Sequence, residues 1–131
     1  MNTKLDKILA EISAGELIDK ITILEIKKNK IKDEDKLNEV QKELSSLTQT
    51  LDKFIPKKDK IMSFKQNLKE INLKLWEIED SKRKAEKDRD FGQNFIELAR
   101  NVYKLNDERA KIKLAINNSL GSNIKEVKSY D

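Results

Sequence analysis

The spacing of the large apolar residues constrains this chain most, because they recur in steps of three and four along three long stretches. Such spacing places one apolar stripe along a helix, and it is typical of helices that pack side by side as in coiled coils. The stretches predict helices over residues 36–54, 59–85 and 91–120, the first of them ended by Pro56. No long stretch alternates apolar and polar residues with period 2, as strands do. The sequence therefore predicts an all-α fold.

A further helix is predicted near the N-terminus, over residues 14–31. Ser13 and Glu16 have the spacing of a capping box, in which the serine hydroxyl accepts a hydrogen bond from a free amide of the first helical turn. Leucine and isoleucine residues then lie nearly all around the helix axis. A helix that is apolar on all sides is buried on all sides. We therefore expect this helix to be central.

The predicted helices over 59–85 and 91–120 are joined by a short charged link, and we expect them to form a long, coiled-coil-like antiparallel hairpin. The start of the second resembles another capping box, from Asp90 to Gln93. Gly121 is expected to end it and to begin a C-terminal tail over 121–131. A length of 131 residues fits one domain, an antiparallel helical bundle spanning the chain.

Composition excludes several chemistries. The chain has no cysteine and no histidine, so thiolate nucleophiles, disulfides, imidazole bases and ordinary zinc sites are absent. Its 28 basic and 24 acidic residues are interspersed rather than clustered, which does not favour nucleic-acid binding. The beginning of the sequence does not resemble a signal peptide, and no stretch has the length of a membrane span. We therefore expect a cytoplasmic protein without a membrane segment.

A second apolar face on each helix of the hairpin carries polar residues that could form a binding wall. At about 100° per residue, both second faces are predicted to lie on one side of the hairpin. The candidate wall comprises Trp76, Asp80, Arg83, Arg100, Tyr103 and Asp107. Aromatic rings beside guanidinium groups suit an anionic or ring-containing ligand. The favoured alternative is structural, with an ion pair between Asp80 and Arg100 and with Trp76 and Tyr103 as core aromatics.

Arg109 interrupts an apolar seam, and a buried charge needs a partner. The hairpin register predicts Glu70 as that partner, in a structural pair that fixes the register. An alternative compares Arg109 and Glu79 with chorismate mutase, which binds a dicarboxylate inside a helix bundle. However, the two residues are expected to lie too far apart along the hairpin to meet one substrate.

Two pairs of carboxylates, Glu16 with Asp19 and Glu77 with Asp80, have the i,i+3 spacing that places both members on one helix face. All-helical nucleoside triphosphate pyrophosphohydrolases hold Mg²⁺ with pairs of this kind, so a metal-dependent enzyme is a further alternative. Such pairs also arise by chance in a chain with 24 acidic residues. The favoured interpretation has no metal and no cofactor.

Four blocks occur together in a specific order: ISAGELIDKITILEIKK from Ile12, INLKLWEIED from Ile71, FIELARNVYKLNDERAKIKLAIN from Phe95, and GSNIKEVKSY from Gly121. With these blocks the chain resembles an uncharacterised bacterial family of short helical proteins, a domain of unknown function. The resemblance spans most of the chain except the region around the predicted helix over residues 36–54 and Pro56. It supports the helical fold and implies no activity.

The sequence thus favours a non-enzymatic helical module that forms oligomers, in the first place a homodimer, or docks a protein partner. The evidence is the two-faced helices and the absence of a convincing catalytic set. A small-ligand-binding or enzymatic helical bundle is the alternative.

Overall fold

The computed structural model describes residues 4–57 and 59–129, and it places four α-helices in them without any strand. The helices are α1 (Ala14–Lys30), α2 (Glu34–Phe54), α3 (Met62–Lys87) and α4 (Gln93–Leu120). The predicted all-α class is confirmed. None of these helices is long and apolar enough to cross a membrane over the residues described.

The starts of α1 and α2 and the end of α4 follow the local capping chemistry, whereas α3 begins at Met62, three residues after the predicted position, without a side-chain cap. As predicted, α1 begins after Ser13, whose hydroxyl accepts a hydrogen bond from the Glu16 amide at 3.1 Å. Helix α2 begins two residues before the predicted position, because the Asp33 side chain caps the Lys36 amide at 3.0 Å. Gly121 ends α4 in the left-handed conformation, with φ of 62°, as expected of a glycine there.

The hairpin turn differs from its prediction. Helix α4 begins at Gln93 and not at residue 91, and the capping residue is Gly92, which has no side chain to bond the helix. The Asp90 carboxylate instead accepts a hydrogen bond from the Gly92 amide at 3.3 Å. The predicted capping box at Asp90 is therefore wrong, because the carboxylate is used within the turn.

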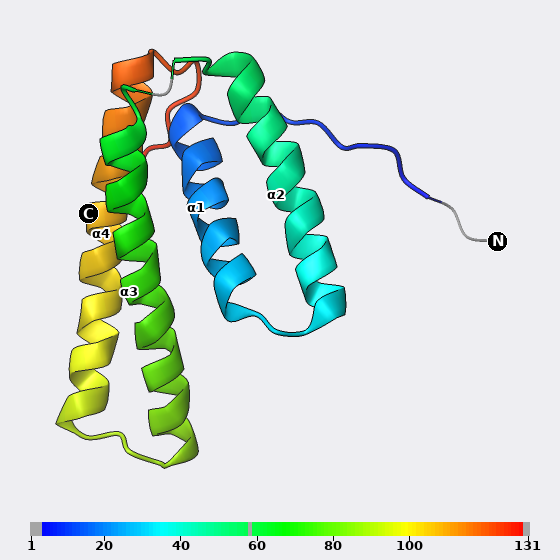
Figure 1. The fold of residues 1–131 in the computed structure, drawn as a ribbon. Helices are drawn as coiled ribbons and strands as arrows, with labels where there is room; N and C mark the ends of the chain where they lie inside the picture. Colours follow the sequence, from blue (N-terminus) through cyan, green and yellow to red (C-terminus); the bar gives the residue numbers. More distant parts are fainter. Residues whose placement is uncertain (1–3, 58, 130–131) are drawn as a thin grey trace.

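Helix α1 is central, as expected, and lies between α2 on one side and the α3–α4 hairpin on the other (Figure 1). It packs against all three other helices, whereas the backbone of α2, in the described chain, lies close only to that of α1, and α2 reaches the common core with its Leu51 side chain. The apolar core lies where the four helices meet. Its buried side chains are Leu17, Ile18, Ile21, Leu51, Ile61, Leu68 and Ile116.

The α3–α4 hairpin extends well beyond the ends of α1 and α2 (Figure 1). In this overhang each of its two helices packs mainly against the other. Apolar side chains remain accessible on α4 and in the turn, among them Phe91, Ile96 and Tyr103.

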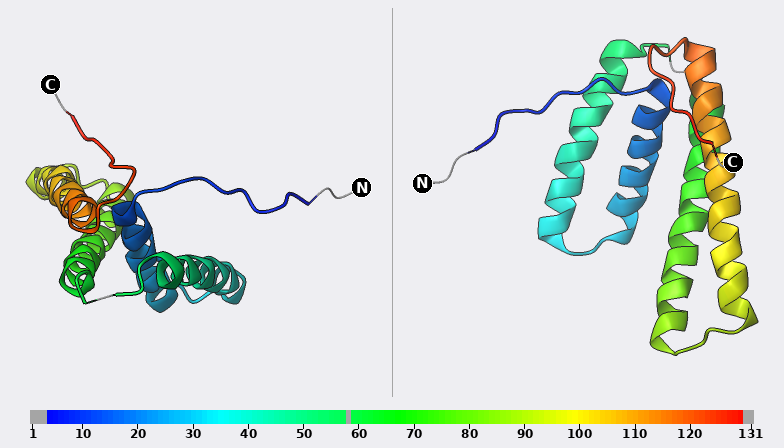
Figure 2. Two further views of the ribbon diagram at one scale, coloured as in Figure 1. Left: turned by 90° about the horizontal axis from the view of Figure 1, so that it is seen from above. Right: turned by 180° about the vertical axis from the view of Figure 1, so that it is seen from behind.

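The N-terminal segment, residues 4–13, has no helical structure and projects away from the helices in all three views (Figures 1 and 2). Its apolar side chains are among the most exposed of the protein, with Leu5 at 81%, Ile8 at 82% and Leu9 at 87%. At its base, Glu11 accepts a hydrogen bond from the Asn123 side chain at 2.6 Å. The segment is therefore attached to the body at one end only.

The C-terminal tail runs back along α4 (Figure 2). The Ser122 hydroxyl accepts a hydrogen bond from the Ala14 amide at 3.1 Å and donates one to the Ile124 carbonyl at 2.7 Å. Farther along, Lys128 pairs with Asp107 at 3.2 Å. The tail therefore links the start of α1 to α4.

Candidate functional site

A buried carboxylate, Asp19 of α1, holds α1, α3 and α4 together. It is 0% exposed. The Asn72 amide of α3 donates to it at 2.8 Å. Arg109 of α4 donates from Nε to both carboxylate oxygens, at 3.0 and 3.1 Å, and from Nη2 to Oδ2. A bidentate, charge-assisted contact of this kind is strong and directional, so it fixes how α4 lies against α1.

The Asn72 side chain is shared between two acceptors. Its amide nitrogen also donates to the Thr22 hydroxyl at 2.9 Å, and that hydroxyl donates to the Asp19 carbonyl at 2.7 Å. Thr22 is fully buried and Asn72 nearly so. These buried polar groups are therefore satisfied by one another, which removes the main cost of placing them in the core.

A second cation, Lys113 of α4, lies next to this network. Its ammonium contacts Glu16 at 2.7 Å, Glu126 of the tail at 2.9 Å and Asp19 at 3.8 Å. Burial of the ammonium lowers the pKa of Lys113. The hydrogen bonds to Glu16 and Glu126 and the nearby negative charges outweigh burial, so the pKa of Lys113 lies above its ordinary value.

The pKa of Arg109 is raised for a similar reason. Its hydrogen bonds to Asp19 raise the pKa, burial lowers it, and the charges of Asp19, Glu16 and Glu126 raise it further. Both cations therefore stay charged across the physiological range. Neither can serve as a general base in this arrangement.

Helix α1 approaches α4 closely at Gly15. A methyl group added there would lie 2.5 Å from the Lys113 carbonyl oxygen, a backbone atom. The Gly15 amide donates to the Asn117 side chain at 2.7 Å. Only a residue without a side chain permits this approach, which brings Asp19 within reach of Arg109.

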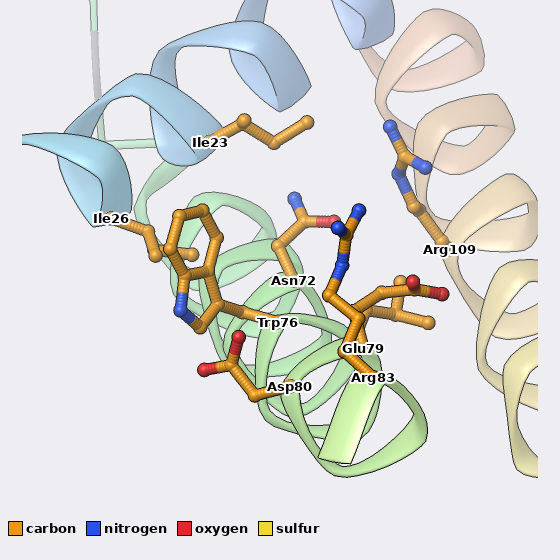
Figure 3. A pocket seen from close by; sticks show the side chains of 9 residues that line it. Ile23, Ile26, Asn72, Trp76, Glu79, Asp80, Arg83 and Arg109 are labelled. Carbon is orange, nitrogen blue, oxygen red and sulfur yellow. The ribbon is translucent and has the colours of Figure 1, made fainter. Parts of the chain in front are cut away.

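A pocket of about 440 Å³ opens beside this network, between α1 and α3 and next to Arg109 (Figure 3). Ile23, Ile26 and Leu75 form its apolar part, and the Trp76 ring lies across from the two isoleucines. Its volume is in the range of small-ligand and side-chain pockets. Asn72, Glu79, Asp80, Arg83 and Arg109 supply its polar lining.

The rim of the pocket carries charges of both signs. Asp80 and Arg83 make no ion pair with any described residue, whereas Glu79 pairs with Lys82 at 3.3 Å. Arg109 reaches the pocket with its guanidinium already bonded to Asp19. The rim therefore offers one free carboxylate and one free guanidinium beside an apolar floor.

The candidate wall predicted from sequence is divided by the structure. Trp76, Asp80 and Arg83 line this pocket together. Tyr103 and Asp107 line a different hollow, between α4 and the C-terminal tail. The second faces of the two helices therefore do not form one surface. The prediction failed because it placed both second faces on one side of the hairpin and did not foresee that the C-terminal tail lies beside Tyr103 and Asp107 of α4.

The predicted ion pair between Asp80 and Arg100 is also wrong. Arg100 pairs with Glu97 at 3.7 Å, one turn away on the same helix. It lines neither the pocket nor the hollow beside the tail. Two residues at the same level of a hairpin need not point toward each other, and the side chains of Asp80 and Arg100 do not.

Arg109 is partnered as predicted, but not by Glu70. Glu70 is exposed and accepts a hydrogen bond from Gln66 at 3.4 Å, while Asp19 occupies the Arg109 guanidinium. The expected separation of Arg109 and Glu79 is wrong as well, since both line the same pocket. The partner of Arg109 lies on α1, whereas the prediction of Glu70 used only the register between α3 and α4.

The two carboxylate pairs proposed for Mg²⁺ do not converge. Glu16 and Asp19 are bound to Lys113 and Arg109. Glu77 lines a shallow hollow on another side of α3, away from the pocket that Asp80 borders. Among the residues described, no three or more acidic side chains are grouped so that they could hold a metal ion.

Sequence reasoning did not identify Asn72, Thr22, Lys113 and Asn117 as parts of the buried network. Asn117 is fully buried and holds the start of α1. One available signal is that Asp19 and Thr22 fall within the most apolar stretch of the chain. Polar residues at positions that helix period places in a core need partners from other helices.

These features define an all-α protein in which a buried ionic network joins three helices beside an open, partly apolar pocket. The model of a family of unknown function, DUF6165, matches residues 8–131, so the chain belongs to that family. This agrees with the resemblance to an uncharacterised family. No curated protein and no solved structure matches the chain.

Proposed function

We propose that this chain is a non-enzymatic helical module that binds another protein chain, in the first place a second copy of itself. The observation that carries the proposal is the N-terminal segment, where Leu5, Ile8 and Leu9 are each more than four-fifths exposed. Isolated surface leucines are ordinary, but a run of them on a segment that projects from the body indicates an interaction site.

The polar groups support a structural role for the buried network. The Asp19 carboxylate and the Arg109 guanidinium are bonded to each other, and Lys113 is held by two glutamates. Cations that are neutralised by protein carboxylates add little attraction for an anionic substrate. The network serves instead to hold α1 against α3 and α4, which keeps the pocket beside it open.

Self-association is tested by sedimentation equilibrium of the full chain. We expect a dimer that dissociates on dilution. A double substitution, Leu5→Ser with Leu9→Ser, should shift the equilibrium strongly toward monomer without changing the helix content. Val127→Ser is the matched control, because this side chain is 86% exposed but lies on the C-terminal tail. A wild-type chain that stays monomeric at high micromolar concentration would contradict the proposal.

A further inference from the structure

The exposed N-terminal segment carries the pattern of a helix although it is not helical here. Leu5, Ile8, Leu9 and Ile12 follow the i, i+3, i+4, i+7 spacing. At about 100° per residue, these four side chains fall within an arc of about 100° of a helix, with charged residues on the remainder. A segment of this length does not stay helical alone in water, and it needs an apolar groove to cover that stripe.

The pocket at Trp76 is a groove of matching character. Its floor is apolar, formed by Ile23, Ile26, Leu75 and Trp76, and it is open to the surface. Amphipathic helices bind such grooves by inserting side chains at the same i, i+3, i+4, i+7 positions. The segment supplies the apolar stripe, and the pocket supplies the surface that would cover it.

The charges of the two surfaces complement each other. On the helical wheel, Lys4 lies along one edge of the stripe and Asp6 along the other. The pocket rim carries a free carboxylate, Asp80, and a free guanidinium, Arg83, neither of which has a described ion-pair partner. Opposite charges at the edges of an apolar contact fix its orientation more than its affinity.

The geometry of the attachment assigns this contact to a second copy. Glu11 is bonded to the body at Asn123, so of the described residues those from 4 to 10 lie beyond the point of attachment. As a helix these seven residues are about 10 Å long, whereas Ile23 lies about 15 Å along α1 from Ser13. The segment of one chain is therefore too short to reach its own groove as a helix. It also points away from the body (Figure 2).

Resting on the proposed function, we infer that residues 4–10 of each chain fold into an amphipathic helix whose Leu5, Ile8 and Leu9 side chains enter the Trp76 pocket of a second copy. Reciprocal exchange of the two segments gives a closed, two-fold symmetric dimer in which both grooves are filled. Each segment gains its helical structure only on binding, which makes the affinity modest for the area covered.

The composition of the chain gives this inference two specific probes. Trp76 is the only tryptophan, so tryptophan emission, excited where the two tyrosines do not absorb, reports on this pocket alone. There is also no cysteine, so a single introduced thiol is the only one in a chain. Both probes can be applied to the full-length protein.

In the first experiment, Trp76 emission is measured as the full chain is diluted. We expect a shift to longer wavelength and stronger quenching by iodide as the dimer dissociates. The Leu5→Ser, Leu9→Ser chain should show the dissociated spectrum at every concentration. A synthetic peptide of residues 1–12, added to that variant, should restore the shorter-wavelength emission. The Val127→Ser control should behave like the wild type.

In the second experiment, chains carrying Leu9→Cys are mixed with chains carrying Asp80→Cys under mild oxidation. We expect a disulfide-linked heterodimer in high yield. Chains carrying Lys104→Cys are the control, since Lys104 is equally on the hairpin but borders a different hollow. Equal yields from the Asp80 and Lys104 positions would overturn the inference.

Sedimentation of the same samples separates this inference from the proposed function. If the chain dimerises and the leucine substitutions abolish the dimer, but Trp76 emission does not change, the segment docks elsewhere and only the inference fails. If the wild type is monomeric, both fail. The Trp76 emission of the wild type could also differ from that of the Leu5→Ser, Leu9→Ser chain by the same amount at every concentration. That result would mean that the segment covers the pocket of its own chain, which also overturns the inference.

Discussion

Removing the Arg109 cation tests whether the buried network determines stability. Arg109→Met keeps the length of the side chain and leaves Asp19 fully buried with the Asn72 amide and, at 3.8 Å, the Lys113 ammonium. Breaking a buried ion pair by removing one partner costs about 3–5 kcal/mol. Because Lys113 remains and the Arg109 side chain is 27% exposed, we expect the lower end, about 3 kcal/mol.

This loss is large enough to measure by thermal unfolding, followed by far-ultraviolet circular dichroism. At roughly 4 °C per kcal/mol for a domain of this size, Tm should fall by about 12 °C. All chains are compared at one concentration, because self-association also stabilises the folded state. Asp19→Asn, combined with Arg109→Met, should cost less than the two single changes added together, by about 1–3 kcal/mol.

Arg100→Met is the matched control for this experiment. Arg100 and its partner Glu97 are 60% and 51% exposed, so the pair is a surface ion pair that contributes less than about 1 kcal/mol. If Arg109→Met lowers Tm no more than Arg100→Met does, or if the coupling energy between Arg109 and Asp19 is zero, the buried network does not hold the helices together.

Three further results are expected. Gly15→Ala should lower the free energy of unfolding by about 1–3 kcal/mol, since the new methyl group lies 2.5 Å from a backbone atom. Gly92→Ala is the control and should not destabilise the fold, because the nearest atom to its new methyl group is at 3.6 Å. Urea unfolding compares the two variants. The pKa of Lys113 is raised in the folded protein, so its charge contributes stability that is fully present below the ordinary pKa of 10.5 and is lost as the pH rises through the higher pKa of the folded state. The difference in urea midpoint between wild type and Lys113→Met should therefore be constant from neutral pH to about 10 and shrink above that. Mg²⁺ and Mn²⁺ should leave Tm unchanged, because the buried carboxylates already have cationic partners; a rise in Tm would revive the metal-dependent alternative.

The sequence predicts most of the fold because helix signals are local. Apolar spacing gives the helices and the hairpin, and the hydroxyl of Ser13 fixes the start of α1. The all-round apolar character of α1 correctly indicates its central position. Boundaries in the turns were less accurate, since the Asp90 carboxylate bonds within the turn rather than capping α4.

The candidate site was harder to predict because it depends on contacts between helices far apart in sequence. The interruption of a seam by Arg109 correctly signals a buried charge with a partner. Helix period cannot identify that partner, because Asp19 lies on a third helix whose height against the hairpin is set by Gly15 and Asn117. Residues within one helix face, such as Trp76 and Asp80, were grouped correctly.

The 90 residues that separate Asp19 from Arg109 have a consequence for synthesis of the protein. At about 5–20 residues per second, the ribosome adds the arginine about 5–18 s after the aspartate. During that interval α1, the most apolar helix of the chain, is without α4, and the Asp19 carboxylate is without the Arg109 cation. The packing around α1 is therefore completed only after α4 has left the ribosome. Until then, the face of α1 that α4 covers in the folded protein remains exposed on the nascent chain.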